Sequence, residues 1–230
     1  MKKLVLFGEG DGEKRALPVI TSRIISEMNA WHVVSLEPDA MIVGELPGLL
    51  KNNAAEWRRF LRIARKRKDF GGVLLLLDGD CPSRSLRGEK FCSKVFAGRL
   101  AKVAVDEGAG TSFSVAIVFA CREFESWIIA GIESLAGRDL PNPATRVEAA
   151  TTPPEGDLES NPRDAKGWLG KHMVNGYSAP RDQAVLAREV DLNLIRSKGM
   201  RSFARFESAI RQLITSFQHS VSIATPFVTE

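Results

Sequence analysis

The sequence predicts an α/β fold, with a mainly parallel sheet and a helical C-terminal extension. Short apolar runs of the kind found in buried strands alternate with helix-like segments through about residue 134, which is typical of right-handed crossover units on a parallel sheet. Farther along the chain the apolar spacing is helical only. We therefore expect an α/β domain over residues 1–135, a loop over 136–162, and a helical extension over 163–218 packed on the same core.

The first strands and the first helix follow from apolar runs and from the breaks between them. Residues 3–7 are apolar enough for a strand that is covered on both faces. A glycine-rich turn then precedes apolar residues with helical spacing, which predicts a helix over 13–28. A second strand is expected near 31–36. Proline and glycine interrupt residues 37–48, where we expect irregular structure.

The rest of the α/β domain repeats this pattern twice. An apolar stripe that includes Trp57 predicts a helix over 53–68. The valine and leucine run that follows predicts a strand over 73–78 and is the most apolar stretch of the chain. After it we expect a helix over 90–107 and a strand over 113–119. A further helix is expected over 123–135.

The C-terminal part differs in composition. Residues 141–162 are rich in proline, threonine and acidic or amide side chains without an apolar period, which indicates a long loop. The tail over 219–230 is expected to be loosely held. Between them the apolar spacing predicts four helices, over residues 163–173, 181–189, 191–197 and 202–217.

Acidic side chains follow three of the expected strands. Glu9 follows the first, Asp78 and Asp80 follow the most apolar one, and Glu123 and Glu125 follow the last. Parallel topology sends all of these to the carboxyl edge of the sheet, where open α/β sheets hold their ligands. Carboxylates gathered there would repel one another, and a hard cation such as Mg2+ or Mn2+ would relieve that repulsion. A single Asp-Gly-Asp turn, however, is also common in solvated loops.

Basic side chains could supply the contacts to a polyanion. The helix over 53–68 carries Arg62, Arg65 and Lys66 next to its apolar stripe, and Lys166 and Lys171 lie in the expected extension. If the helix borders the acidic edge, its basic groups would contact phosphates. The alternative is a solvated cationic helix face.

Length and composition exclude several classes of protein. The 230 residues are enough for one good core, and no apolar stretch reaches the roughly 18 residues of a membrane span. The first residues do not form a secretory signal, and the three cysteines have no spacing typical of a metal site or a disulfide framework. We therefore expect a cytoplasmic protein that is not inserted in a membrane. A net charge of +4 permits binding to a polyanion without requiring it.

The order of the acidic motifs resembles the Toprim fold of topoisomerases, primases and overcoming-lysogenization-defect nucleases. Its two signatures are similar to Glu9-Gly10-Asp11-Gly12-Glu13 and Asp78-Gly79-Asp80. Within that group, the chain resembles a Toprim-like family catalogued only as a domain of unknown function (4276), over most of its length. The segments that carry this narrower likeness are Arg122-Glu123-Phe124-Glu125-Ser126-Trp127 and Arg201-Ser202-Phe203-Ala204-Arg205-Phe206.

This resemblance implies a Toprim/Rossmann-like sheet and a Mg2+-dependent nuclease that hydrolyses phosphodiesters in DNA or RNA. It implies that Glu9 is the general acid and base and that Asp78 and Asp80 hold the metal. Glu125 is the closest match to the third acidic position of the family, and either Glu123 or Glu125 would complete a second metal position. The resemblance also implies an ATPase protein partner and a role in bacterial defence or DNA repair. No tyrosine-bearing topoisomerase domain is present in the sequence.

Two other functions remain open at this stage. A hydrophobic strand followed by Asp-x-Asp is also the nucleophile motif of haloacid-dehalogenase-type phosphatases, although Pro82 stands where those enzymes have threonine. The other alternative is a non-enzymatic module whose acidic edge binds a metal or a partner. Turnover of a phosphatase substrate would indicate the first, and metal binding without turnover would indicate the second.

Overall fold

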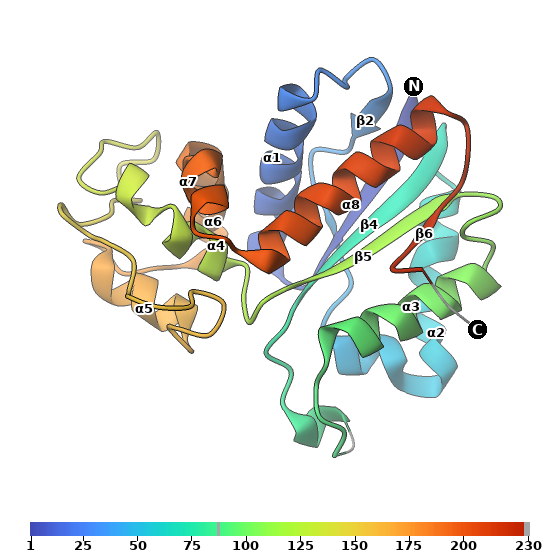
Figure 1. Cartoon of the computed structure of the whole chain (residues 1–230), viewed down its shortest axis with the longest axis horizontal. Helices are drawn as coiled ribbons and strands as arrows, with labels where there is room; N and C mark the ends of the chain where they lie inside the picture. The colour runs from blue at the N-terminus through green and yellow to red at the C-terminus, as the bar shows by residue number, and fades with distance from the viewer. Residues whose placement is uncertain (87, 228–230) are drawn as a thin grey trace.

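The computed structural model describes residues 1–86 and 88–227 and contains a six-stranded sheet with helices on both faces (Figure 1). The strand order is β2-β1-β4-β5-β6, with β3 also paired to β1, and every pair among the described strands is parallel. This confirms the α/β prediction of a mainly parallel sheet. The strands are β1 (Lys2–Gly8), β2 (Val34–Leu36), β3 (Met41–Ile42), β4 (Phe70–Asp78), β5 (Ser114–Ala120) and β6 (Ala224–Thr225).

Two apolar layers enclose the sheet because successive side chains of a strand point to opposite faces. Leu74 and Leu76 of β4 pack on one face with α1 (Asp11–Glu27) and α8 (Arg201–Gln218). Leu75 and Leu77 pack on the other face with α2 (Leu46–Arg65) and α3 (Ser93–Asp106). Both faces of β4 and β5 are therefore dry, which explains their uninterrupted apolar runs.

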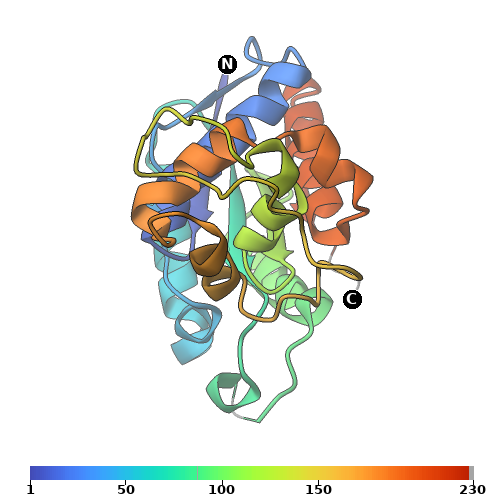
Figure 2. The ribbon, with the colours of Figure 1, turned by 90° about the vertical axis from the view of Figure 1, so that its left-hand side faces the viewer.

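The remaining helices gather beyond the carboxyl end of β5, as Figure 1 and the turned view of Figure 2 show. The long segment 137–164 connects them, and its Val147 forms an isolated bridge with Met173. Helix α6 packs along α1, so the extension closes over the end of the sheet. These helices are α4 (Glu125–Ala130), α5 (Ala165–His172), α6 (Ala179–Glu189) and α7 (Leu192–Ser197); short 3-10 turns cover η1 (Ser83–Leu86) and η2 (Ile132–Ser134).

Three local differences from the sequence predictions have physical causes. Residues 37–48, which were expected to be irregular, contain β3 and the start of α2. Helix α2 also has a kink over Lys51–Ala54. Asn52 and Asn53 adopt positive φ there, a conformation that asparagine tolerates. The tail expected to be loosely held instead pairs with β5 through β6, because Val115 donates its N–H to Ile223 O at 2.8 Å.

None of the described helices combines the length and apolar character needed to cross a membrane.

Candidate metal centre

The ends of β4 and β5 bring three carboxyl groups together at the carboxyl edge of the sheet. Asp78 is the last residue of β4, Glu125 opens α4, and Glu123 lies between β5 and α4. One oxygen from each of these groups lies within 4.8 Å of the other two. We call Asp78, Glu123 and Glu125 the acidic cluster. Parallel topology predicted that these acids would meet, and in the structure they do.

Asp78 joins the end of β4 to the start of α4. Its side chain is buried, and its Oδ1 accepts a hydrogen bond from Phe124 N–H at 2.9 Å. Its Oδ2 lies 3.5 Å from Lys166 Nζ. Burial, with Glu125 and Glu13 nearby, raises the pKa of Asp78 well above its usual value. Its negative charge is therefore unfavourable unless a cation compensates it.

The chain turns away from the sheet directly after Asp78, and this turn separates Asp80 from the acidic cluster. Gly79 donates its N–H to Arg122 O at 2.7 Å, and a Cβ at Gly79 would lie only 2.6 Å from Ala120 O. The close approach of the two chains thus requires glycine. Asp80 lies beyond the turn and is exposed; partial burial and the nearby charge of Glu123 raise its pKa. Asp80 is therefore not one of the three residues of the acidic cluster.

Glu123 anchors α5 as well as belonging to the acidic cluster. Its Oε2 accepts hydrogen bonds from the backbone N–H groups of Ala165, at 2.9 Å, and Lys166, at 3.3 Å. These are the first residues of α5, whose unpaired amides and positive dipole end favour a carboxylate. Its Oε1 lies 3.1 Å from Lys166 Nζ. One oxygen of Glu123 is thus committed to the fold, and the other faces the cluster.

Glu125 is the most deeply placed member of the acidic cluster, with none of its surface exposed. Its Oε1 accepts hydrogen bonds from Tyr177 O–H at 2.7 Å and from Gln183 Nε2 at 3.2 Å. Its Oε2 has no hydrogen-bond partner among the described residues. Burial raises the pKa of Glu125 to about 7, against the opposing effects of Lys166 and Tyr177. This buried oxygen therefore lacks a hydrogen bond, and Lys166 Nζ lies 3.9 Å from it.

A second hydrogen bond of Gln183 connects α6 to the turn after β1. Its Nε2 donates to Glu13 Oε1 at 3.1 Å, and Glu13 Oε2 accepts the N–H of Gly10 at 2.9 Å. Gln183 approaches Gly12 so closely that a Cβ on Gly12 would collide with it. The glycine-rich turn of the first motif thus makes room for a side chain of the extension.

Glu9 lies at the rim of the acidic cluster. Its half-buried side chain accepts a hydrogen bond from Asp78 N–H at 3.1 Å. Burial raises the pKa of Glu9 to about 7, although the hydrogen bond from Asp78 opposes the shift; Glu13 and Asp80 add to it. Glu9 therefore sits next to the cluster with a carboxyl group that titrates near neutral pH.

The ammonium of Lys166 is the only cation that the described residues place on the acidic cluster. Its Nζ lies 3.5 Å from Asp78, 3.1 Å from Glu123 and 3.9 Å from Glu125. Burial would lower the pKa of Lys166, but the three carboxylates outweigh it and raise that pKa above its ordinary value. Lys166 was predicted to contact phosphates, whereas in this structure it contacts the acids.

The basic helix residues lie far from the acidic cluster. Arg62, Arg65 and Lys66 occupy the end of α2, which leads into the amino end of β4, whereas Asp78 is at the carboxyl end. At a rise of roughly 3.3 Å per residue, the nine residues of β4 separate these ends by about 26 Å. Arg62 instead pairs with Glu107 at 2.8 Å. The basic end of this helix therefore does not border the acidic edge, because a crossover helix ends where the next strand begins.

Sequence reasoning missed Tyr177 and Gln183, which reach the acidic cluster from the segment before α6 and from α6 itself. Tyr177 is the only tyrosine in the chain, but no motif marked it or Gln183, because their positions depend on how the extension packs. Lys171 lies in the last turn of α5 with its side chain exposed, and it makes no ion pair with the cluster.

Comparison with known proteins identifies the family but not an activity. Neither the curated proteins nor the solved structures contain a significant match. A family description does match, over residues 8–211, and this range includes every member of the acidic cluster. The chain therefore belongs to the family described as "Domain of unknown function (DUF4276)".

Proposed function

We propose that the protein is a Mg2+-dependent phosphodiester hydrolase that acts on DNA or RNA. The observation that carries this proposal is Glu125. It is fully buried, one of its oxygens has no hydrogen-bond partner among the described residues, and it belongs to a group of carboxyl oxygens within 4.8 Å of one another. A buried polar atom without a partner is unfavourable, so a cation bound among these oxygens would remove an energetic penalty.

The ligand atoms fit a hard divalent cation. All three members of the acidic cluster offer carboxylate oxygens, which Mg2+ and Mn2+ prefer. Asp78 and Glu125 would be the principal ligands, and Oε1 of Glu123, which pairs with Lys166 in this structure, would be a third. Mg2+ bound by so few protein ligands keeps positions for water and for phosphate oxygens of a substrate.

Other side chains of the site would transfer the proton and position the metal ligands. When bound, the metal would supply charge neutralisation at the phosphoryl oxygens and would lower the pKa of a ligand water. Glu9 would take up and return the proton, since its pKa of about 7 suits a general base and acid at neutral pH. Tyr177 and Gln183 would position Glu125 by holding its Oε1, so that Oε2 faces the acidic cluster.

Lys166 would compete with the metal for the same oxygens. Its ammonium contacts all three carboxyl groups of the acidic cluster, and a divalent cation on those groups would repel it. Its side chain is 44 % exposed and long enough to turn outward. Lys166 would then contact a phosphate of the bound substrate.

The resemblance to Toprim-like proteins supports the wider parts of the proposal. These are nucleic acid as the substrate, an ATPase as a partner, and a role in bacterial defence or DNA repair. A cytoplasmic location belongs with them and is supported by Cys81, Cys92 and Cys121, which are free thiols in the structure.

The proposal is tested by cleavage of single-stranded DNA, duplex DNA and RNA in the presence of Mg2+, Mn2+ or EDTA. We expect metal-dependent cleavage that falls at least a hundredfold in Asp78→Asn. The matched control is Asp69→Asn, which makes the same change at the other end of β4, at an exposed position where a positive φ also suits asparagine. Equal cleavage rates in wild type and Asp78→Asn would rule out this site. Cleavage that continues at the same rate in EDTA would do so as well.

A second candidate function is a non-enzymatic module that binds a metal or a partner through the acidic cluster. The observation that favours it is Lys166, which already partly compensates the buried carboxylates. Under this alternative the protein binds Mn2+ in a manner that depends on Asp78 but cleaves none of the substrates. Calorimetry beside the cleavage assay separates the two functions.

A further inference from the structure

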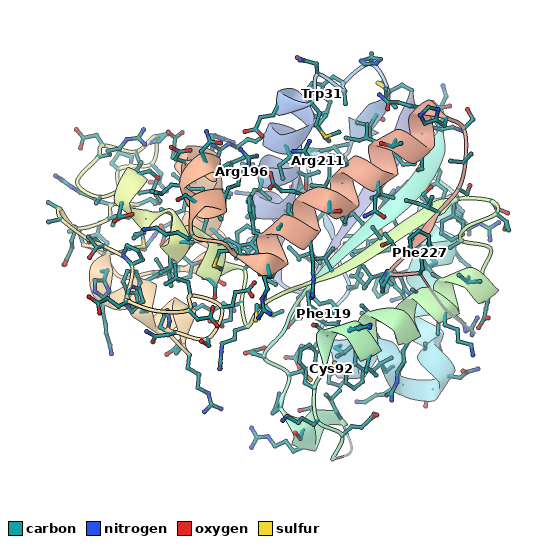
Figure 3. The ribbon with its side chains drawn as sticks, in the orientation of Figure 1. Trp31, Cys92, Phe119, Arg196, Arg211 and Phe227 are labelled. Atoms are coloured by element: carbon teal, nitrogen blue, oxygen red, sulfur yellow. The ribbon has the colours of Figure 1, made fainter. Side chains whose placement is uncertain are left out.

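The outer edge of the sheet is open along the second half of β5. Within the described residues, β6 pairs only with Val115 and Ala116, and no strand continues beside Ile117 to Ala120. Figure 1 shows β5 passing between α8 and α3 on this side, and Figure 3 shows Phe119 in the space between the two helices. The edge is thus available to another extended segment.

The free edge presents backbone groups that need partners. Val115 donates its N–H outward, to Ile223 O. Backbone groups point to alternate sides along a strand, so those of Ile117 and Phe119 face the same side as those of Val115. The pairing of Ala116 with Thr225 directs the N–H of Ile117 to β6, which leaves the C=O of Ile117 and both groups of Phe119. At Phe119 no backbone partner on that side is present among the described residues. Unpaired edges of this kind accept an added strand from another chain.

A groove lies directly over this edge. It has a volume of about 290 Å³ and is lined by Ile117, Val118 and Phe119 of β5, and also by Thr225 and Pro226 at the end of β6. Ala97 of α3 and Ala209 of α8 form parts of its walls. A strand laid here would find apolar side chains on both sides and backbone groups along one edge.

The rim of the groove is basic. Lys94 projects from α3 and Arg205 from α8, and no acidic side chain lines the groove within the described residues. Other basic residues of the same two helices form ion pairs: Arg99 of α3 pairs with Glu89, and Arg201 of α8 pairs with Glu159. Neither Lys94 nor Arg205 has such an ion-pair partner in the part of the chain that the structure describes, so the two helices offer one free positive charge each.

We propose that this groove binds an extended acidic segment of a partner protein, which adds to the sheet as a strand beside Ile117 to Phe119. Neighbouring residues of a strand point to opposite faces, so two adjacent acids would meet Lys94 on one side and Arg205 on the other. Backbone pairing would supply affinity, and the charges would select the sequence. This site is separate from the acidic cluster and does not depend on its proposed activity.

The test uses fluorescence anisotropy with the labelled peptide Val-Thr-Glu-Glu-Thr-Val. We expect it to bind the full chain, and its twin with two lysines in place of the glutamates to bind at least tenfold more weakly. Charge reversal in Lys94→Glu with Arg205→Glu should lower affinity at least tenfold. Lys68→Glu with Lys102→Glu, which alters the same total charge at exposed positions outside the groove, should leave the affinity unchanged.

Two N-methylated versions of the peptide test the strand pairing without altering the protein. Amides of alternate residues point to opposite edges of the peptide strand, so each version has the amides of one edge methylated. The version methylated on the edge that faces β5 should lose binding, and the other version should retain it. The Phe119 amide should also gain protection from hydrogen exchange in the complex. Absence of peptide binding, equal binding of both methylated versions, or an unchanged affinity in the Lys94 and Arg205 double variant would overturn the proposal. The basic rim would then serve only to prevent edge-to-edge aggregation.

Discussion

At the scale of single residues, the proposed chemistry depends on carboxyl groups whose ionised forms are disfavoured by burial. Glu125 and Glu9 both have pKa values of about 7, chiefly because of burial. Asp78 is shifted in the same direction. In the metal-free protein Glu125 and Glu9 are therefore partly protonated at neutral pH. A bound divalent cation would favour the ionised forms, and metal binding should release protons.

The first prediction concerns Glu125→Gln and the pH dependence of stability. The pKa of Glu125 is about 7 in the folded protein, and in the unfolded chain it is near the ordinary glutamate value of 4.5. Below 4.5 both states are protonated, and above 7 both are ionised, so the folded state is penalised progressively between these values. The penalty at high pH is on the order of 3 kcal/mol. Metal-free Glu125→Gln should therefore be more stable than wild type at pH 8 and similar to it at pH 4.5.

Urea unfolding in EDTA across this pH range checks the prediction. Because glutamine keeps the size of glutamate and can still accept the Tyr177 O–H, the comparison isolates the charge. Parallel stability curves for wild type and variant would show that Glu125 does not titrate in this window.

The second prediction concerns Lys166→Met. Loss of the ammonium removes a competitor and leaves the acidic cluster more negative, so Mn2+ should bind about tenfold more tightly. The matched control is Lys171→Met on the same helix, whose exposed side chain makes no ion pair with the cluster; its metal affinity should be that of wild type. Weaker Mn2+ binding in Lys166→Met would mean that Lys166 supports the site instead of blocking it.

At the scale of elements, the site is assembled from a sheet edge and from helices that follow it in the chain. Glu123 fixes the start of α5 and so places Lys166. Segments around α6 supply Tyr177 and Gln183 to Glu125. Helix α2 points the other way, because its end feeds the amino end of β4. The extension therefore completes the acidic edge, and the basic helix does not contribute to it.

The third prediction concerns the basic end of α2. Replacing Arg62, Arg65 and Lys66 together by alanine should leave nucleic-acid binding and its salt dependence unchanged, since these residues are a strand length from Asp78. Stability should fall slightly, because the exposed ion pair of Arg62 with Glu107 and the contact of Arg65 with Glu107 O are lost. A salt series of filter-binding measurements checks this. A flatter slope in the triple variant would place nucleic acid on α2 after all.

The sequence predicts the parts of this architecture that depend on local pattern. The runs ending at Phe7 and Asp78 are uniformly apolar, which identifies buried parallel strands and so places the acids at one edge. It does not predict where Asp80 points, since that depends on the close contact of Gly79 with Ala120. The sequence also does not reveal the role of Tyr177, because the position of this side chain depends on how helices distant in the sequence pack.

At the scale of the whole molecule, one sheet carries two separate surfaces. The carboxyl edge holds the acidic cluster, enclosed by the extension, and the outer edge of β5 holds the basic groove between α3 and α8. Any cation bound in the acidic cluster would link the end of β4 to the start of α4, since Asp78, Glu123 and Glu125 would supply its contacts. Binding to the folded state alone stabilises a protein by mass action. Saturating Mn2+ should accordingly raise the melting temperature of wild type.

The most direct test of the central claim is titration calorimetry with Mn2+ at pH 7 in two buffers of different ionisation enthalpy. The account predicts saturable binding with release of protons, because Glu125 and Glu9 titrate near this pH. It predicts that both signals are lost in Asp78→Asn and are retained in Asp69→Asn. Identical affinity and proton release in wild type and Asp78→Asn would contradict the claim that the acidic cluster holds a metal.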